Sequence, residues 1–131
     1  IMIIAGIIFV LIAAFRETYE EIGVPESRIN AIGELDDYIT GTGFHIETYV
    51  GIIKKNTIFR VNKEEVSELI FLPIEVLQNK TNIIWTSKKF GNKSYNFWKI
   101  KFLNYNIWGA TASILANLSV KVWETKLQKA T

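Results

Sequence analysis

Three glutamates near the start of the chain have the spacing that brings carboxylates together. Glu17, Glu20 and Glu21 stand at positions i, i+3 and i+4 of a segment with helical periodicity, so they project from one side of a helix. Converging carboxylates repel one another unless a cation lies among them, and Mg²⁺ or Mn²⁺ prefers such oxygen ligands. The cluster therefore indicates either a divalent-metal site or a solvated acidic helix face with Arg16 as its local ion-pair partner.

The helix that would position these carboxylates is predicted from apolar residues at three- and four-residue spacing, which are Ile12, Phe15, Tyr19 and Ile22. Gly23 suits the left-handed position after a last helical turn, and Pro25 cannot continue a helix. We therefore expect the helix to end at about Gly23.

Strands and two further helices are predicted beyond this point. Strands are expected over Ile29–Leu35, Phe44–Ile53, Ile58–Val61, Glu65–Pro73 and Tyr95–Phe102. A short helix is expected over Ile74–Leu77, an exposed loop or hairpin over Asn79–Ser94, and a terminal helix capped by Asn106 with Ile107, Ile114, Leu115, Leu118 and Val122 on one face. This order of elements predicts a mixed α+β domain.

Composition excludes several classes of protein. The 131 residues suffice for one domain with its own core, and the absence of cysteine excludes zinc–thiolate sites, iron–sulfur clusters, thiol nucleophiles and disulfides. The 15 basic and 13 acidic side chains occur along the whole chain, and with a net charge of +2 we expect no nucleic-acid partner. The oligomeric state stays open.

The first residues form an apolar run without a charged side chain, from Ile1 to Phe15. This run is shorter than the roughly 18 to 20 residues that a membrane-spanning helix needs. It also has neither the basic start nor the cleavage site of a secretory signal. We expect a buried segment of a cytoplasmic protein, with a membrane anchor as the alternative.

The segment Arg16–Val24, RETYEEIGV, resembles the second half of the Nudix hydrolase signature. The matching residues are Arg16, Glu17, Glu20, Glu21, Gly23 and Val24, while Thr18 stands in a position that is usually aliphatic. The resemblance implies that Glu17, Glu20 and Glu21 bind the catalytic Mg²⁺ or Mn²⁺ ions. It also implies that Arg16 orients a catalytic carboxylate through a salt bridge.

Later segments are similar to the coenzyme A diphosphohydrolase branch of this family, namely Gly33–Ile53, Glu64–Leu77 and Ile107–Leu118. The resemblance implies a Nudix-type α/β/α sandwich with a mixed sheet over about residues 13–123, followed by a tail over 124–131. The implied reaction cleaves the diphosphate of coenzyme A, or of an acyl-coenzyme A, to a 4′-phosphopantetheine product and adenosine 3′,5′-bisphosphate.

Metal-assisted hydrolysis of a phosphoanhydride also requires a base that activates water. Glu47, Glu65 or one of the three helix glutamates could take this role, and a surface position is the alternative for each. Six further residues could either contact the substrate or have a purely structural or surface position. They are His45, Trp108, Gly109, Lys88, Lys89 and Lys93.

The first half of the Nudix signature is not matched. Counting back from Arg16, Ile8 occupies the position of its glutamate and Met2 the position of its glycine, and we expect the first strands of the fold to be missing. A frameshifted start, a fragment and an inactive relative are the three explanations. The alternative function is therefore a catalytically inactive Nudix-like binding domain, which residues 1–15 could hold at a membrane.

Overall fold

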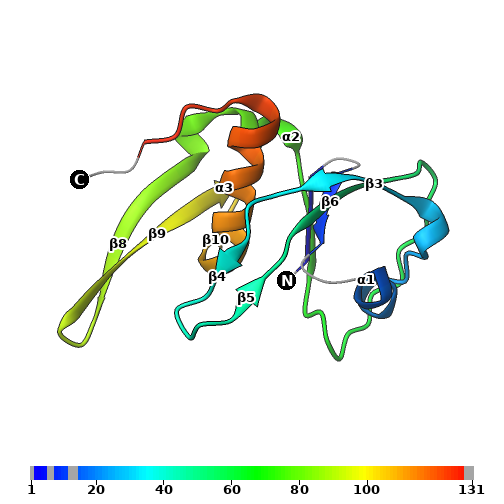
Figure 1. Cartoon of the computed structure of the whole chain (residues 1–131), viewed down its shortest axis with the longest axis horizontal. Coiled ribbons are helices and arrows are strands. Elements are labelled where there is room, and N and C mark those ends of the chain that lie inside the picture. Colours follow the sequence, from blue (N-terminus) through cyan, green and yellow to red (C-terminus); the bar gives the residue numbers. More distant parts are fainter. Residues whose placement is uncertain (1, 6–7, 12–14, 129–131) are drawn as a thin grey trace. The chain divides into compact units, whose positions relative to one another are not determined.

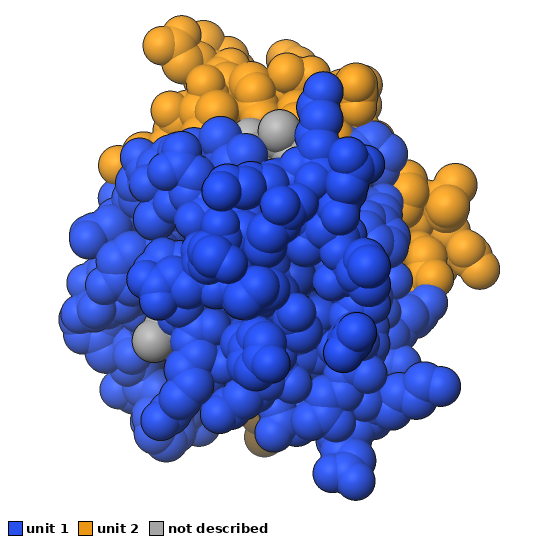
Figure 2. All heavy atoms as spheres, turned by 90° about the vertical axis from the view of Figure 1, so that its right-hand side faces the viewer, with its two compact units in different colours: residues 1–73 blue, residues 74–131 orange. Residues whose placement is uncertain are grey.

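A computed structural model describes residues 2–5, 8–11 and 15–128, with side chains described from residue 15 onward (Figure 1). The chain divides into two compact units, residues 1–73 and residues 74–131, which Figure 2 distinguishes by colour. Each unit combines helix with antiparallel strands, which confirms the predicted α+β class.

The first unit is built on a mixed sheet. Its described strands follow the order β3-β6-β2-β1-β7. Their bounds are β1 (Met2–Ala5), β2 (Ile8–Leu11), β3 (Ile29–Glu34), β6 (Tyr49–Ile53) and β7 (Leu69–Leu72). Strands β1 and β7 pair in parallel, whereas the other neighbours pair antiparallel, so the mixed sheet implied by the resemblance is present.

The apolar start of the chain contributes two strands to the interior of this sheet. Strand β1 pairs with β2 on one side and β7 on the other, and β2 pairs with β6. Periodicity alone does not identify a strand within a continuous apolar run, which explains why the sequence did not predict β1 and β2. No helix within the described residues is long and apolar enough to span a membrane. Ile12, the predicted first residue of the helical face, lies outside the described residues.

Helix α1 (Phe15–Ile22) and the 3-10 turn η1 (Glu26–Arg28) join the sheet through one apolar cluster. The buried members of this cluster are Ile22, Val24, Ile29 and Ile53. The half-buried side chains packed against it are Phe15, Tyr49, Phe59 and Leu69. Of the apolar face predicted for the helix, Phe15 and Ile22 fix α1 against β3 and β6, whereas Tyr19 is 58% exposed.

The strand predicted over Phe44–Ile53 is interrupted. A two-residue ribbon, β4 (Tyr38–Ile39) with β5 (His45–Ile46), precedes β6, and Glu47 and Thr48 lie between β5 and β6. Thr48 is buried, and its carbonyl accepts a hydrogen bond from the backbone N–H of Leu35 at 2.9 Å. This bond belongs to a loop contact and does not extend the sheet.

Of two other strand predictions, one was wrong and one was too long. Ile58–Val61 is not a strand, and the alternating run Glu65–Pro73 forms a strand only over β7. Backbone N–H groups of this region bond instead to the end of α1, from Arg60 to the carbonyl of Ile22 and from Asn62 to that of Glu21. The alternating apolar pattern therefore predicted strands wrongly here, because the backbone N–H groups of this region form hydrogen bonds outside a sheet.

The second unit consists of a three-stranded antiparallel sheet and two helices. Its elements are α2 (Ile74–Gln78), the 3-10 turn η2 (Lys80–Asn82), β8 (Ile83–Phe90), β9 (Lys93–Phe102), β10 (Tyr105–Ile107) and α3 (Gly109–Trp123). The sheet order is β10-β9-β8. The predicted short helix is confirmed as α2, and the loop or hairpin is a hairpin that turns at Gly91 with φ +63°.

The prediction that Asn106 caps the last helix is wrong. Asn106 lies in β10 opposite Lys101, and α3 begins at Gly109 after the extended residue Trp108. Because Asn106 pairs with β9 in an extended conformation, its backbone is not available to begin a helix. Of the residues predicted to share the apolar face of this helix, Ile114, Leu115 and Leu118 are buried in α3, whereas Val122 is 45% exposed and Ile107 belongs to β10.

Candidate active site

The predicted metal-binding glutamates lie on the outward side of α1. Glu17 and Glu20 are exposed and Glu21 is half-buried, whereas Thr18 and Ile22 face the interior. The i, i+3, i+4 spacing therefore places the three carboxylates on one side of the helix, as predicted.

Arg16 pairs with one of these carboxylates. Its Nε lies 3.7 Å from Oε1 of Glu20, and the two side chains are 80% and 51% exposed. An exposed i,i+4 pair of this kind contributes about 0.3–0.5 kcal/mol to stability.

The end of α1 is held by a loop from a distant part of the sequence. Gly23 has φ +71°, and its N–H donates to the carbonyl of Tyr19 at 2.9 Å. A side-chain Cβ at this glycine would lie 2.8 Å from Cβ of Arg60. Only glycine both adopts this backbone angle without strain and admits the loop so closely.

The same loop, which runs from Arg60 to Glu65, brings the carboxylate of Glu65 toward the helix. The N–H of Asn62 donates to the carbonyl of Glu21 at 2.8 Å, and Glu65 follows in a turn in which its N–H donates to the carbonyl of Asn62 at 3.1 Å. Glu65, one of the two predicted bases outside the helix, is thus held beside Glu21.

Electrostatics single out Glu21 within this group. Partial burial raises the pKa of its carboxyl above the ordinary value, and the negative charges of Glu17, Glu65 and Glu20 raise the pKa further. A partly buried carboxyl with several carboxylates around it is one that a bound cation would stabilise strongly.

The donor chemistry of this group suits Mg²⁺ or Mn²⁺, since carboxylate oxygens are the ligands these ions prefer. Within the described residues, no three acidic or histidine side chains are gathered closely enough to enclose an ion. Glu17 and Glu20 are exposed at the helix surface, so rotation about their side-chain bonds would be needed to bring their oxygens to a common point.

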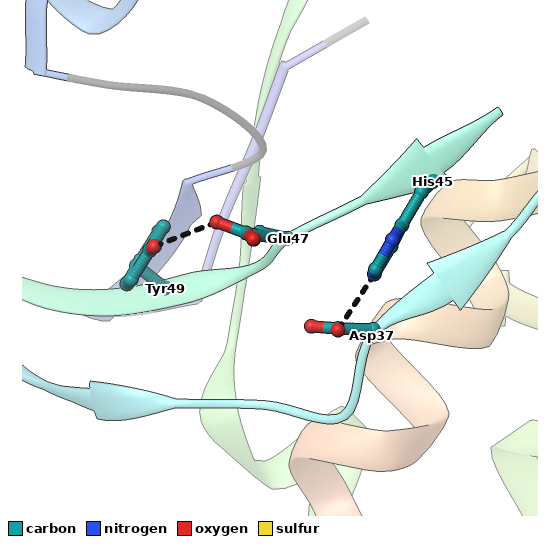
Figure 3. Close-up of polar contacts among 4 residues, drawn as sticks. All are labelled: Asp37, His45, Glu47 and Tyr49. Carbon is teal, nitrogen blue, oxygen red and sulfur yellow. Dashed lines mark hydrogen bonds and ion pairs between the residues drawn. The ribbon is translucent and has the colours of Figure 1, made fainter.

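A second group of polar residues lies around the ribbon β4–β5 (Figure 3). Nε2 of His45 lies 2.6 Å from Oδ2 of Asp37, and the Tyr49 hydroxyl donates to Oε2 of Glu47 at 3.0 Å. This hydrogen bond, together with the negative charge of Glu47, raises the pKa of the Tyr49 hydroxyl. Glu47, the other base predicted outside the helix, is therefore already bonded to Tyr49.

Asp37 and Tyr49 were not among the predicted site residues, and the place of Asp37 follows from the register of the β4–β5 ribbon. Ile39 lies opposite His45 in the ribbon, so Asp37, two residues earlier, falls on the same face and within diagonal reach of the imidazole. The His45 side chain is 57% exposed, in keeping with the predicted surface position.

The remaining predicted residues lie in the second unit. Trp108 is 64% exposed, and its ring centroid lies 6.2 Å from that of Phe97. Gly109 has φ +71°. Lys88, Lys89 and Lys93 are exposed near the turn of the β8–β9 hairpin.

Comparisons with known proteins support the family resemblance. The chain is 33% identical over 111 residues, 84% of its length, to proteins named uncharacterized Nudix hydrolase NudL from Salmonella paratyphi B and Salmonella newport. It spans 57% of the length of these curated relatives. No family model matches the chain.

Proposed function

We propose that this chain is part of a Nudix hydrolase that cleaves the diphosphate of a nucleotide derivative with the help of divalent metal ions. The similarity to Nudix hydrolases over 84% of the chain supports the reaction class. The match of Arg16–Val24 to the second half of the signature supports the position of the site on α1.

One observation carries the assignment of the metal site. Glu21 is half-buried and lies within electrostatic reach of Glu17, Glu20 and Glu65, which raises the pKa of its carboxyl. This arrangement disfavours the charged form of Glu21 unless positive charge is supplied. Metal ions bound by Glu17, Glu20 and Glu21 would neutralise the diphosphate oxygens and lower the pKa of an attacking water.

The other residues of α1 support these carboxylates. The 3.7 Å ion pair supports a role for Arg16 in orienting the Glu20 carboxylate. Gly23 admits the loop that carries Glu65, and Glu65 is our preferred acceptor for the proton of the attacking water. Glu47 is less suited to this role, because its carboxylate already accepts the Tyr49 hydroxyl proton in a hydrogen bond.

The proposed substrate is coenzyme A or an acyl-coenzyme A. The products would be 4′-phosphopantetheine, or its acylated form, and adenosine 3′,5′-bisphosphate. The resemblance of Gly33–Ile53, Glu64–Leu77 and Ile107–Leu118 to the coenzyme A branch supports this choice.

The test is chromatographic detection of adenosine 3′,5′-bisphosphate after incubation of the chain with coenzyme A and Mn²⁺ or Mg²⁺. Glu20→Gln and Glu21→Gln should each lower turnover by about a hundredfold or more, as loss of an essential electrostatic group does. Glu26→Gln is the matched control, because Glu26 is an exposed glutamate in η1, outside the cluster.

Each outcome bears on a different part of the proposal. Turnover that survives both Glu20→Gln and Glu21→Gln would show that the metal site lies elsewhere. Release of product from another nucleoside diphosphate derivative, but not from coenzyme A, would overturn only the substrate. Mn²⁺ binding and coenzyme A binding without turnover would instead identify a non-catalytic binding domain.

A further inference from the structure

The net charge of +2 conceals a strong division of charge between the two units. Residues 74–131 contain nine lysines and two glutamates, a net charge of +7, whereas residues 1–73 contain six basic and eleven acidic residues, a net charge of −5. No aspartate or glutamate occurs between Val76 and Trp123. The charges are therefore not evenly mixed, and the reason for expecting no nucleic-acid partner does not hold for the second unit.

Four of the nine lysines of this unit lie on one face of the β8–β9 hairpin. The register pairs Lys88 with Tyr95 and Phe90 with Lys93, so these four residues share a face. Alternation along β9 adds Phe97, Lys99 and Lys101. We call these seven residues, Lys88, Phe90, Lys93, Tyr95, Phe97, Lys99 and Lys101, the lysine–aromatic face.

The opposite face of the same sheet is the one that builds the core of the unit. Ile83, Ile100 and Ile107 lie side by side in the register and are buried, and α3 packs against β9. The hairpin extends well beyond the end of α3 (Figure 1). The lysine–aromatic face is therefore not required for the core of this unit.

Two of the three aromatic rings on this face are exposed, whereas Phe97 is half-buried, and each ring has an aromatic neighbour. Phe90 and Tyr95 are 54% and 49% exposed, and their ring centroids are 5.6 Å apart near the turn. Phe97 forms a second pair with Trp108, which is 64% exposed. Nζ of Lys88 lies 5.3 Å from the Phe90 ring centroid, so a positive charge and an aromatic ring lie next to each other on this face.

We propose that the lysine–aromatic face binds single-stranded nucleic acid. Lysines would contact successive phosphates, and the exposed rings would stack on unpaired bases, which is how sequence-tolerant single-strand binding surfaces work. The distribution of the rings favours this ligand over an anionic membrane. Insertion into a bilayer requires an apolar surface free of charge, whereas here Lys88 and Lys93 flank the rings near the turn, and Lys99 and Lys101 follow them toward the base of the hairpin.

The experiment is fluorescence anisotropy of the full chain with a labelled single-stranded oligothymidylate, compared with a duplex of the same length. We expect the single strand to bind more tightly, because bases stacked within a duplex cannot stack on protein rings. Lys88→Gln combined with Lys93→Gln should reduce the slope of log K against log salt concentration by about 1.4. Lys80→Gln with Lys126→Gln, an equal loss of charge at exposed positions outside the face, should leave most of the affinity.

The aromatic contribution is tested separately. Phe90→Ala with Tyr95→Ala should weaken binding by about tenfold or more, whereas Phe90→Tyr with Tyr95→Phe, which keeps both rings, should restore it. Circular dichroism establishes that each variant is folded. The proposal is overturned if no binding occurs at low salt, or if the lysine and aromatic variants bind like the unaltered chain. It is also overturned if vesicles containing phosphatidylserine bind and the oligonucleotide does not.

Discussion

The backbone N–H of Asn62 donates a hydrogen bond of 2.8 Å to the carbonyl of Glu21, the most buried of the three carboxylate-bearing residues of α1. This bond satisfies a carbonyl at the end of the helix that has no partner within the helix itself. It also fixes the loop that carries Glu65 beside the candidate metal site. Whether Glu65 belongs to the candidate site therefore depends on the hydrogen bonds at the C-terminal end of α1.

Replacement of Gly23 tests this arrangement. Gly23→Ala should destabilise the first unit by about 2 kcal/mol, because alanine at φ +71° is strained and its Cβ would lie 2.8 Å from Cβ of Arg60. Urea denaturation measures the change. Gly41→Ala is the control, since no atom lies within 4 Å of a Cβ added there. Equal effects of the two substitutions would contradict the proposed role of Gly23.

Glu21→Gln should separate stability from metal binding. The folded state raises the pKa of the Glu21 carboxyl, so it binds a proton more readily than the unfolded chain does. The ionised carboxylate therefore reduces stability near neutral pH, and this loss is recovered as the pH falls through the folded-state pKa. Removal of the charge should modestly raise the melting temperature at pH 7 and abolish Mn²⁺ binding. A lower melting temperature with Mn²⁺ binding retained would refute both assignments.

The pH dependence of Mn²⁺ binding follows from the same raised pKa. Protons and the metal ion compete for the Glu21 carboxylate, so affinity should begin to fall at a higher pH than an ordinary glutamate would cause. Calorimetric titration across this range measures both the affinity and the protons released. If Mn²⁺ affinity stays constant through the range in which glutamates titrate, the ion does not bind to these carboxylates.

Thr48→Val should stabilise the chain by about 1 kcal/mol. The Thr48 side chain is 1% exposed, and its Oγ1 has no hydrogen-bond partner within the described part of the chain. Valine has nearly the same shape without the polar atom, so the cost of burying the hydroxyl disappears. Thr125→Val is the matched control, because the buried Thr125 hydroxyl donates to the carbonyl of Leu77 at 3.1 Å and its loss should destabilise. Thermal melts of both variants should shift in opposite directions.

Tyr49 combines packing with a polar contact, and two substitutions separate them. Tyr49→Phe keeps the ring in the cluster of Ile22, Val24, Ile29 and Ile53 and removes only the bond to Glu47, at a cost of about 1 kcal/mol or less. Tyr49→Ala also removes the ring and should cost about 3 kcal/mol. Similar losses from the two variants in urea denaturation would show that the ring contributes little.

Local signals predicted the elements whose structure depends on near neighbours in the sequence. The end of α1 at Ile22 follows from the glycine and proline that come next, and the outward side of α1 follows from the spacing of Glu17, Glu20 and Glu21. The hairpin turn likewise required only a glycine that tolerates a positive φ. Such features are decided within a few residues, so a single sequence is sufficient to recognise them.

The tertiary structure decided what joins distant residues. Residues 2–5 and 8–11 are strands because β7 and β6 supply pairing partners, and apolar periodicity alone does not distinguish such buried strands from helices. Glu65 reaches Glu21, and Asn106 joins β10 instead of capping α3, through backbone hydrogen bonds made far along the chain. The sequence by itself determined which side chains carry charge and on which side of α1 they lie. Which charged side chains lie close together was decided by long-range pairing of the backbone, whose N–H and C=O groups are the same at every non-proline residue and so carry no local signal of their partners.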